Sequence, residues 1–203
     1  MQKRLSHNLA QSIAGSINRY AGKEGLEYTK MEFGLESFLI NVSKLIIVYA
    51  FAILLGTLAQ TLIIQAAFAF LRRYSFGLHA LKSTVCTIVS CSLFVLIPWA
   101  LPDVSIGNAA VLAVYVPLLV LFYMYAPADT KARPLIGAKL RAKLKKQAVA
   151  CVMILMIVTV LIPNGNIKLL LALGAVYQCV SILPLTYKIL RRSEKNYEKY
   201  EHV

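Results

Sequence analysis

The chain has 203 residues, of which 59% are hydrophobic and 15% are charged. Soluble domains carry about 45–50% apolar and about 25% charged residues, so the composition excludes an ordinary soluble core and indicates lipid around much of the chain. The formal net charge is +13, but the basic residues cluster between apolar runs, which favours membrane topology and contact with anionic headgroups over nucleic-acid binding.

Residues 1–35 predict an amphipathic segment at the amino terminus. Apolar side chains recur at every fourth position from Leu5 to Ile17, which is helical spacing, and polar or basic residues separate them. We expect this helix to lie on the membrane surface or to pack on the bundle. Gly22 and Gly25 interrupt it, and a short second helix is expected before the first membrane span.

Six apolar segments follow, and we interpret them as membrane spans. They cover residues 38–55, 57–72, 85–101, 106–126, 148–162 and 167–187. The first two share one apolar stretch that is too long for a single span of about 20 residues and slightly short for two. We favour two short helices that turn at Gly56-Thr57, and one long tilted helix is the alternative.

The basic segments between the spans predict the orientation. Arg72 and Arg73, the 131–146 loop and the carboxyl-terminal tail are basic, and short basic loops mark the cytoplasmic side. Six spans place all of them inside together with the basic amino terminus, whereas five spans would separate that terminus from the 131–146 loop. The sequence therefore predicts an all-α, polytopic membrane helical bundle with both termini cytoplasmic. Its expected parts are a cytoplasmic-face segment (1–35), one transmembrane domain (36–188) and a basic tail (189–203).

His79 and Cys86 are the residues best suited to chemistry. They lie seven positions apart, which is nearly one face of a straight helix but about 10.5 Å along its axis. That distance is too long for an imidazole–thiol hydrogen bond, so a cooperating pair needs a bend between the two residues. Gly77 permits such a bend, and Ser83 is a candidate cap for a helix that holds Cys86 in its first turn.

This arrangement suits nucleophilic catalysis. A helix amino terminus and nearby cations favour a thiolate, first-turn N–H groups can stabilise an oxyanion, and His79 can serve as the base. The candidate catalytic residues are His79 and Cys86, and the candidate substrate-binding residues are Arg72, Arg73, Lys82 and Ser83. A structural role for the pair is the alternative, because Cys91 shows that cysteines occur in this segment without a histidine nearby.

Neither a metal nor a cofactor is expected. The four cysteines contain no CxxC pair, so neither a zinc site nor a redox motif is predicted. No Asp, Glu or Asn occurs between Arg72 and Leu101, so His79 has no orienting acid close in sequence. A more distant carboxylate, such as that of Asp129, would have to approach it through the fold.

Two motifs carry a family resemblance. They are Arg72-Arg73-Tyr74-Ser75-Phe76-Gly77-Leu78-His79-Ala80 followed by Cys86, and Tyr125-Ala126-Pro127-Ala128-Asp129-Thr130 followed by Pro134-Leu135. Together with the basic loop and the hydrophobic layout, they resemble the AgrB family, the membrane endopeptidases of bacterial quorum sensing, over nearly the whole chain. The family pattern has a Gly-Gly pair where this chain has Phe76-Gly77. Phenylalanine disfavours positive φ, so the turn before His79 is expected to differ.

The resemblance implies a cysteine peptidase of the bacterial plasma membrane with its active site at the cytoplasmic face. Such enzymes cut an AgrD propeptide on the carboxyl side of its future ring. Cys86 would be acylated, and a thiol or hydroxyl of the peptide would then close a thiolactone or lactone autoinducing peptide.

The implied partners are an AgrD-like propeptide, anionic membrane lipids and a second copy of the chain, with no nucleic acid. The 131–146 loop could attract the acidic part of the propeptide, or it could serve topology alone. A transporter or exporter of a small peptide without proteolytic activity is the alternative function. Against transport, the spans hold almost no ionisable residues.

Overall fold

The computed structural model describes residues 2–22, 24–78, 83–130, 134–193 and 196–201. The elements within these ranges are helices, which confirms the predicted all-α class. In chain order they are α1 (Gln2–Ala21), α2 (Gly25–Leu54), α3 (Leu58–Ser75), α4 (Ser83–Cys91), the π-helical turn η1 (Ser92–Leu96), α5 (Ile97–Ala100), α6 (Asn108–Tyr125), α7 (Ala138–Leu161), α8 (Gly165–Ile182), α9 (Pro184–Ile189) and α10 (Glu198–Glu201).

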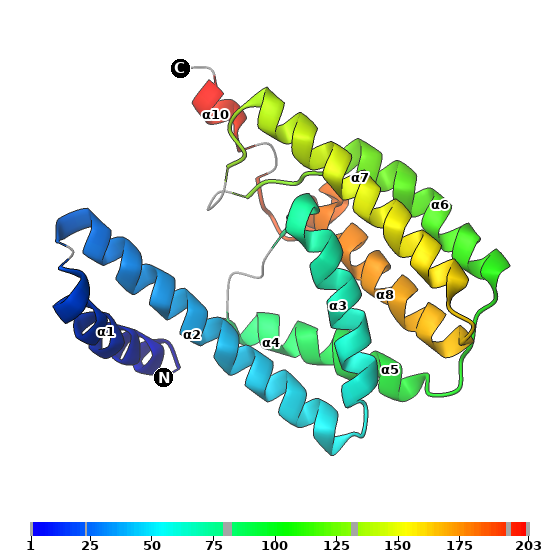
Figure 1. Ribbon diagram of the computed structural model, residues 1–203, viewed down its shortest axis with the longest axis horizontal. Coiled ribbons are helices and arrows are strands. Elements are labelled where there is room, and N and C mark those ends of the chain that lie inside the picture. Colours follow the sequence, from blue (N-terminus) through cyan, green and yellow to red (C-terminus); the bar gives the residue numbers. More distant parts are fainter. Residues whose placement is uncertain (1, 23, 79–82, 131–133, 194–195, 202–203) are drawn as a thin grey trace.

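Four helices, α3, α6, α7 and α8, pack together into a bundle (Figure 1). Its core contains the fully buried side chains of Leu71, Tyr115 and Phe122. One polar contact crosses this apolar core, because the Tyr115 hydroxyl is 3.1 Å from Thr159 Oγ1, which itself donates to the Leu155 carbonyl at 2.7 Å. Both hydroxyls are therefore satisfied without water, as a membrane interior requires.

The outer surface of the bundle is apolar. The helices α2, α6, α7 and α8 are long and apolar enough to cross a membrane, and Thr84–Ala100 forms a shorter apolar helix. Large side chains such as Val116 and Ile157 are exposed on this surface, where lipid would cover them. All six predicted segments fall on helices, and the chain is a helical membrane protein.

The first long apolar stretch is divided as favoured from the sequence. The helix α2 ends at Leu54, Gly56 has φ +68°, and α3 starts at Leu58. A positive φ suits glycine, which explains the turn at this residue. The single tilted helix is thus excluded. The expected short second helix is wrong, because α2 runs without a break from Gly25 through the first predicted span.

The third apolar segment is helical from Ser83 to Ala100 but contains the π-helical turn η1. Pro98 follows this turn and has no N–H to donate to the carbonyl four residues earlier, that of Phe94. The hydroxyl of Thr61 on α3 donates to this carbonyl at 2.8 Å. A polar side chain of the second predicted span thus satisfies a backbone carbonyl of the third.

The amino-terminal helix α1 lies beside α2 at one side of the molecule (Figure 1). Its Ala10 and Ala14 are fully buried, whereas Ile13 and Ile17 on the predicted apolar stripe are 38% and 43% exposed. Small side chains allow close helix packing, and the exposed isoleucines remain available to lipid. The predicted amphipathic helix is therefore confirmed, with its alanine face as a packing surface.

The contact between α3 and α8 prepares the site. Gly174 on α8 lies so close to α3 that an added Cβ would come within 2.6 Å of the Ile64 carbonyl oxygen and 2.7 Å of the Ala67 Cβ. Only glycine permits this approach. One turn further along α8, Gln178 consequently faces the carboxyl-terminal end of α3.

Candidate active site

The backbone leaves α3 through a turn in which two successive residues have positive φ. Phe76 has φ +55° and ψ −128°, and Gly77 has φ +109°. The phenylalanine thus adopts a conformation that favours glycine, at the position where the family pattern has glycine. Such a strained residue persists only where its surroundings hold it in place.

The two motifs of the sequence meet at this turn. The Ala128 N–H donates to the Ser75 carbonyl at 2.9 Å, and the Gly77 N–H donates to the Ala128 carbonyl at 3.1 Å. These bonds form a parallel bridge between Phe76 and Ala128, directly after the cis Ala126–Pro127 peptide bond. The Ala-Pro segment therefore braces the chain just before His79.

The helix α8 supports the same turn from another side. The Leu78 N–H donates to the Ser181 carbonyl at 3.0 Å. Gly77 is buried against α8, where an added Cβ would come within 2.6 Å of Ser181 Oγ and 2.9 Å of the Ser181 carbonyl oxygen. Gly77 is therefore required both for its backbone angle and for the lack of a side chain.

Arg72 points back along this turn. Its Nη2 donates to the carbonyls of Gly77 and Leu78 at 3.2 and 3.0 Å, and its Nη1 donates to Gln178 Oε1 at 3.4 Å. The guanidinium also lies 5.3 Å from the centre of the Phe68 ring. A planar fork with several donors can hold two carbonyls at once, which a lysine ammonium does less well.

Gln178 completes the network, and the sequence analysis did not identify it. The side chain is fully buried, and its Nε2 donates to Ser75 Oγ at 2.7 Å and to the Phe76 carbonyl at 2.6 Å. Since Arg72 can only donate and the Phe76 carbonyl can only accept, one orientation of the amide satisfies both. An uncharged amide within the apolar 167–187 segment was the signal that could have found it.

Cys86 lies in the first turn of α4, as expected from the sequence, and its thiol is partly buried and free of a disulfide. Arg72 is close enough to interact electrostatically with Tyr187 and with Cys86. The guanidinium that holds the turn before His79 thus also lies within electrostatic range of the candidate nucleophile. The first turn of a helix has N–H groups without intrahelical partners, which suit a developing oxyanion.

The other predicted site residues are distributed as follows. His79 and Lys82 lie outside the described residues, and Ser83 is the first residue of α4. Arg73 is exposed, with its guanidinium 5.7 Å from the centre of the Tyr74 ring. The two neighbouring arginines thus have different surroundings: Arg72 binds the backbone carbonyls of the turn, and Arg73 is exposed.

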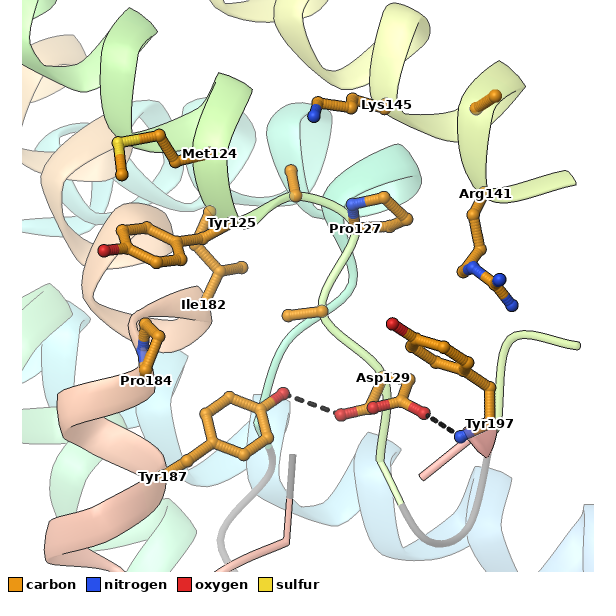
Figure 2. A pocket seen from close by; sticks show the side chains of 13 residues that line it. Met124, Tyr125, Pro127, Asp129, Arg141, Lys145, Ile182, Pro184, Tyr187 and Tyr197 are labelled. Atoms are coloured by element: carbon orange, nitrogen blue, oxygen red, sulfur yellow. Dashed lines mark hydrogen bonds between the residues drawn. The ribbon is translucent and has the colours of Figure 1, made fainter. Parts of the chain in front are cut away.

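Asp129, in the second motif, anchors the carboxyl-terminal segment. Its Oδ2 accepts from the Tyr197 N–H at 2.9 Å and its Oδ1 from the Asn196 amide at 3.4 Å, while its carbonyl accepts from the Tyr187 hydroxyl at 2.8 Å. Asp129, Tyr187 and Tyr197 line a cavity of about 580 Å³ together with Arg141 and Lys145 of α7. Figure 2 shows these side chains around it. The Ala-Pro segment is therefore braced by the tail on one side and braces the turn before His79 on the other.

The arrangement can support acyl transfer. It combines a thiol in the first turn of a helix, a guanidinium within electrostatic range of that thiol, and a hydrogen-bonded turn that directly precedes His79 in the sequence. Nucleophile, base and oxyanion donors are the parts that cysteine peptidases need.

Comparison with known proteins gives consistent results along the whole chain. The chain is 44% identical to a putative AgrB-like protein of Clostridium acetobutylicum, over 97% of this chain and 94% of the relative. An AgrB-like protein of Listeria innocua is 42% identical over 97% and 96% of the two chains. The accessory gene regulator protein B of Staphylococcus haemolyticus is 29% identical over 89% and 95%. No solved structure matches the chain.

The family model for Accessory gene regulator B matches residues 7–182. This range includes both motifs and the helices α2 to α8 that position them. The chain therefore belongs to the AgrB family, whose members take part in agr quorum sensing.

Proposed function

We propose that this protein is a membrane cysteine endopeptidase that cleaves an AgrD-like propeptide and cyclises it to a thiolactone or lactone. One observation carries the proposal: Arg72 binds the carbonyls of Gly77 and Leu78, directly before His79, and lies within electrostatic range of Cys86. The chain segments that carry the candidate base and the candidate nucleophile thus converge on one cation.

In the proposed reaction, His79 takes the proton of the Cys86 thiol, and the thiolate attacks the scissile carbonyl. First-turn N–H groups of α4 stabilise the oxyanion. The carbon–nitrogen bond breaks, and the imidazolium returns its proton to the leaving amine, which departs with the carboxyl-side fragment. A thiol or hydroxyl of the bound peptide then attacks the Cys86 thioester, which closes the ring and frees the thiol. Exclusion of water from the acyl-enzyme favours ring closure over hydrolysis.

The remaining assignments are part of the same proposal. Arg73, which is exposed, and Lys82 and Ser83 contact the propeptide, while Arg72 acts through its hold on the turn. Residues 36–188 form the peptidase domain between the cytoplasmic-face segment 1–35 and the basic tail 189–203. Both termini and the site face the cytoplasm, anionic headgroups surround the basic ends of the helices, and the chain can pair with a second copy.

Co-expression with a candidate propeptide tests the reaction. Cleavage should be lost in Cys86→Ala and His79→Ala and retained in Cys91→Ala, with equal amounts of each variant in the membrane. Cys91 is the matched control because it lies on the same helix and is also a free, partly buried thiol. Normal cleavage by Cys86→Ala would refute the proposal. Export of uncut propeptide would favour the transport function instead.

A further inference from the structure

We propose that Gln178 is a positioning residue for the His79–Cys86 pair, and this inference rests on the proposed function. Gln178 belongs to neither motif and lies about 100 positions after the turn that it binds. Its side-chain amide links α8 to the turn through two hydrogen bonds. The amide oxygen accepts from Arg72, and the amide nitrogen donates to the Phe76 carbonyl.

The contacts of Gln178 have two separable parts. Its Nε2 donates to Ser75 Oγ and to the Phe76 carbonyl, at 2.7 and 2.6 Å. Its Oε1 accepts from Arg72 at 3.4 Å. The first part holds the backbone of the turn, and the second part orients the guanidinium that binds the carbonyls of Gly77 and Leu78.

The conformation of the turn explains why such a residue is needed. Phe76 has φ +55°, which a phenylalanine adopts only when its environment compensates for the strain. Gln178 binds the carbonyl of this residue from a fully buried position. Without these bonds the turn can relax, and the chain continues from it through Leu78 directly to His79. A displacement of about 1 Å in a catalytic group can cost about a hundredfold in rate.

Two substitutions remove different parts of the contact. Gln178→Met keeps the length and apolar volume of the side chain but has neither donor nor oxygen acceptor. Gln178→Glu keeps an acceptor for Arg72 but replaces the Nε2 donors with oxygen. Tyr177→Phe is the matched control, because the buried Tyr177 hydroxyl has no hydrogen-bond partner within the described structure.

The experiment uses the full-length protein purified in lipid nanodiscs. Cleavage of a synthetic propeptide gives kcat and KM, and thermal unfolding gives the folded fraction. The pH profile of Cys86 alkylation by iodoacetamide, followed by mass spectrometry of the Cys86 peptide, reports on the pair without any propeptide. His79→Ala defines the profile of a thiol that has lost its base.

We expect both Gln178 variants to lower kcat by at least about tenfold, which corresponds to a displacement of the base of a fraction of an ångström. KM should change by less than about threefold, and the alkylation profile should move toward that of His79→Ala. Tyr177→Phe should match the wild type. A loss of activity in proportion to the folded fraction, with an unchanged alkylation profile, would reduce Gln178 to a structural role and overturn the inference. So would wild-type kcat in Gln178→Met.

The two proposals fail in different ways. If Cys86→Ala cleaves normally, the proposed peptidase function is wrong, and the alkylation profile still decides whether Gln178 controls the pair. If Cys86→Ala and His79→Ala are inactive but Gln178→Met is fully active, the peptidase function stands and the inference about Gln178 is wrong.

Discussion

Gly77→Ala should disturb the turn before His79 through both backbone strain and a clash with α8. The residue has φ +109°, and an added Cβ would lie 2.6 Å from Ser181 Oγ, 2.9 Å from the Ser181 carbonyl oxygen and 3.2 Å from Ile182 Cγ2. The side-chain hydroxyl can rotate away, but the carbonyl belongs to the backbone of α8 and accepts the Leu78 N–H. The turn must therefore move away from α8.

The expected magnitude has two parts. A non-glycine residue at strongly positive φ costs about 1–3 kcal/mol. Overpacking against backbone costs about 1–3 kcal/mol more. Gly77→Ala should accordingly lower the free energy of unfolding by about 2–6 kcal/mol in total. Gly137→Ala is the matched control, because Gly137 has φ +100° but an added Cβ meets no described heavy atom within 4 Å.

The assay is equilibrium unfolding by SDS in mixed micelles, followed by helical circular dichroism. Gly77→Ala should be less stable than Gly137→Ala by the packing part, about 1–3 kcal/mol. Adding Ser181→Ala to Gly77→Ala should recover only a fraction of the loss, since the contact with the Ser181 carbonyl oxygen remains. Equal stability of Gly77→Ala and Gly137→Ala would refute the claim that the turn is packed tightly against α8.

Three further substitutions test other parts of the argument. Phe76→Gly should keep cleavage and relieve backbone strain, whereas Phe76→Val should destabilise the protein by about 1–2 kcal/mol in the same unfolding assay, because β-branched residues tolerate positive φ worst; the reverse order would contradict a strained turn. Gly174→Ala should separate α3 from α8, with an added Cβ 2.6 Å from the Ile64 carbonyl oxygen, and should lower the melting temperature; an unchanged value would mean that the helices have room. Asn108→Ala removes the acceptor of the buried Lys168 ammonium and should cost about 1–3 kcal/mol, while Asn108→Asp should restore stability; equal stability of all three proteins would show that Lys168 has another partner.

Much of the architecture was predictable because hydrophobic length and turn chemistry are local properties. The turn at Gly56 and the start of α8 at Gly165 follow from residues that favour turns between apolar runs. The Asn164 side chain caps α8 by accepting the N–H groups of Asn166 and Ile167, at 2.9 and 3.1 Å. The start of α2 at Gly25 was not predictable from the apolar pattern, because the first turns of this helix are polar. They belong to α2 only because the helix continues without a break into the apolar run.

The π-helical turn and the buried lysine were not predictable in the same way. Pro98 indicates that the carbonyl four residues earlier lacks its usual N–H donor. Only the fold shows that the Thr61 hydroxyl donates to that carbonyl instead. In the sequence, Lys168 lies just after the Pro163-Asn164-Gly165-Asn166 segment at the start of an apolar run, and only packing buries it against Asn108. In both cases the partner lies on another helix, at a position that no local pattern encodes.

For the candidate site, the sequence alone indicated which residues are candidates for the chemistry. His79 and Cys86 lie too far apart along one straight helix for direct contact, so the bend between them stays a prediction. The described residues show that α3 ends at Ser75, before His79, and that α4 begins at Ser83. Cys86 in the first helical turn also followed from the local pattern.

The tertiary structure decided what holds the turn before His79. It gave Arg72 the carbonyls before His79 as partners, paired the turn with Ala128 and set Gln178 beneath it. The physical reason is that a strained turn has no local source of stability, and its hydrogen bonds must come from segments distant in the sequence. Which segments supply them is decided by helix packing, through contacts such as the close approach of α3 and α8 at Gly174.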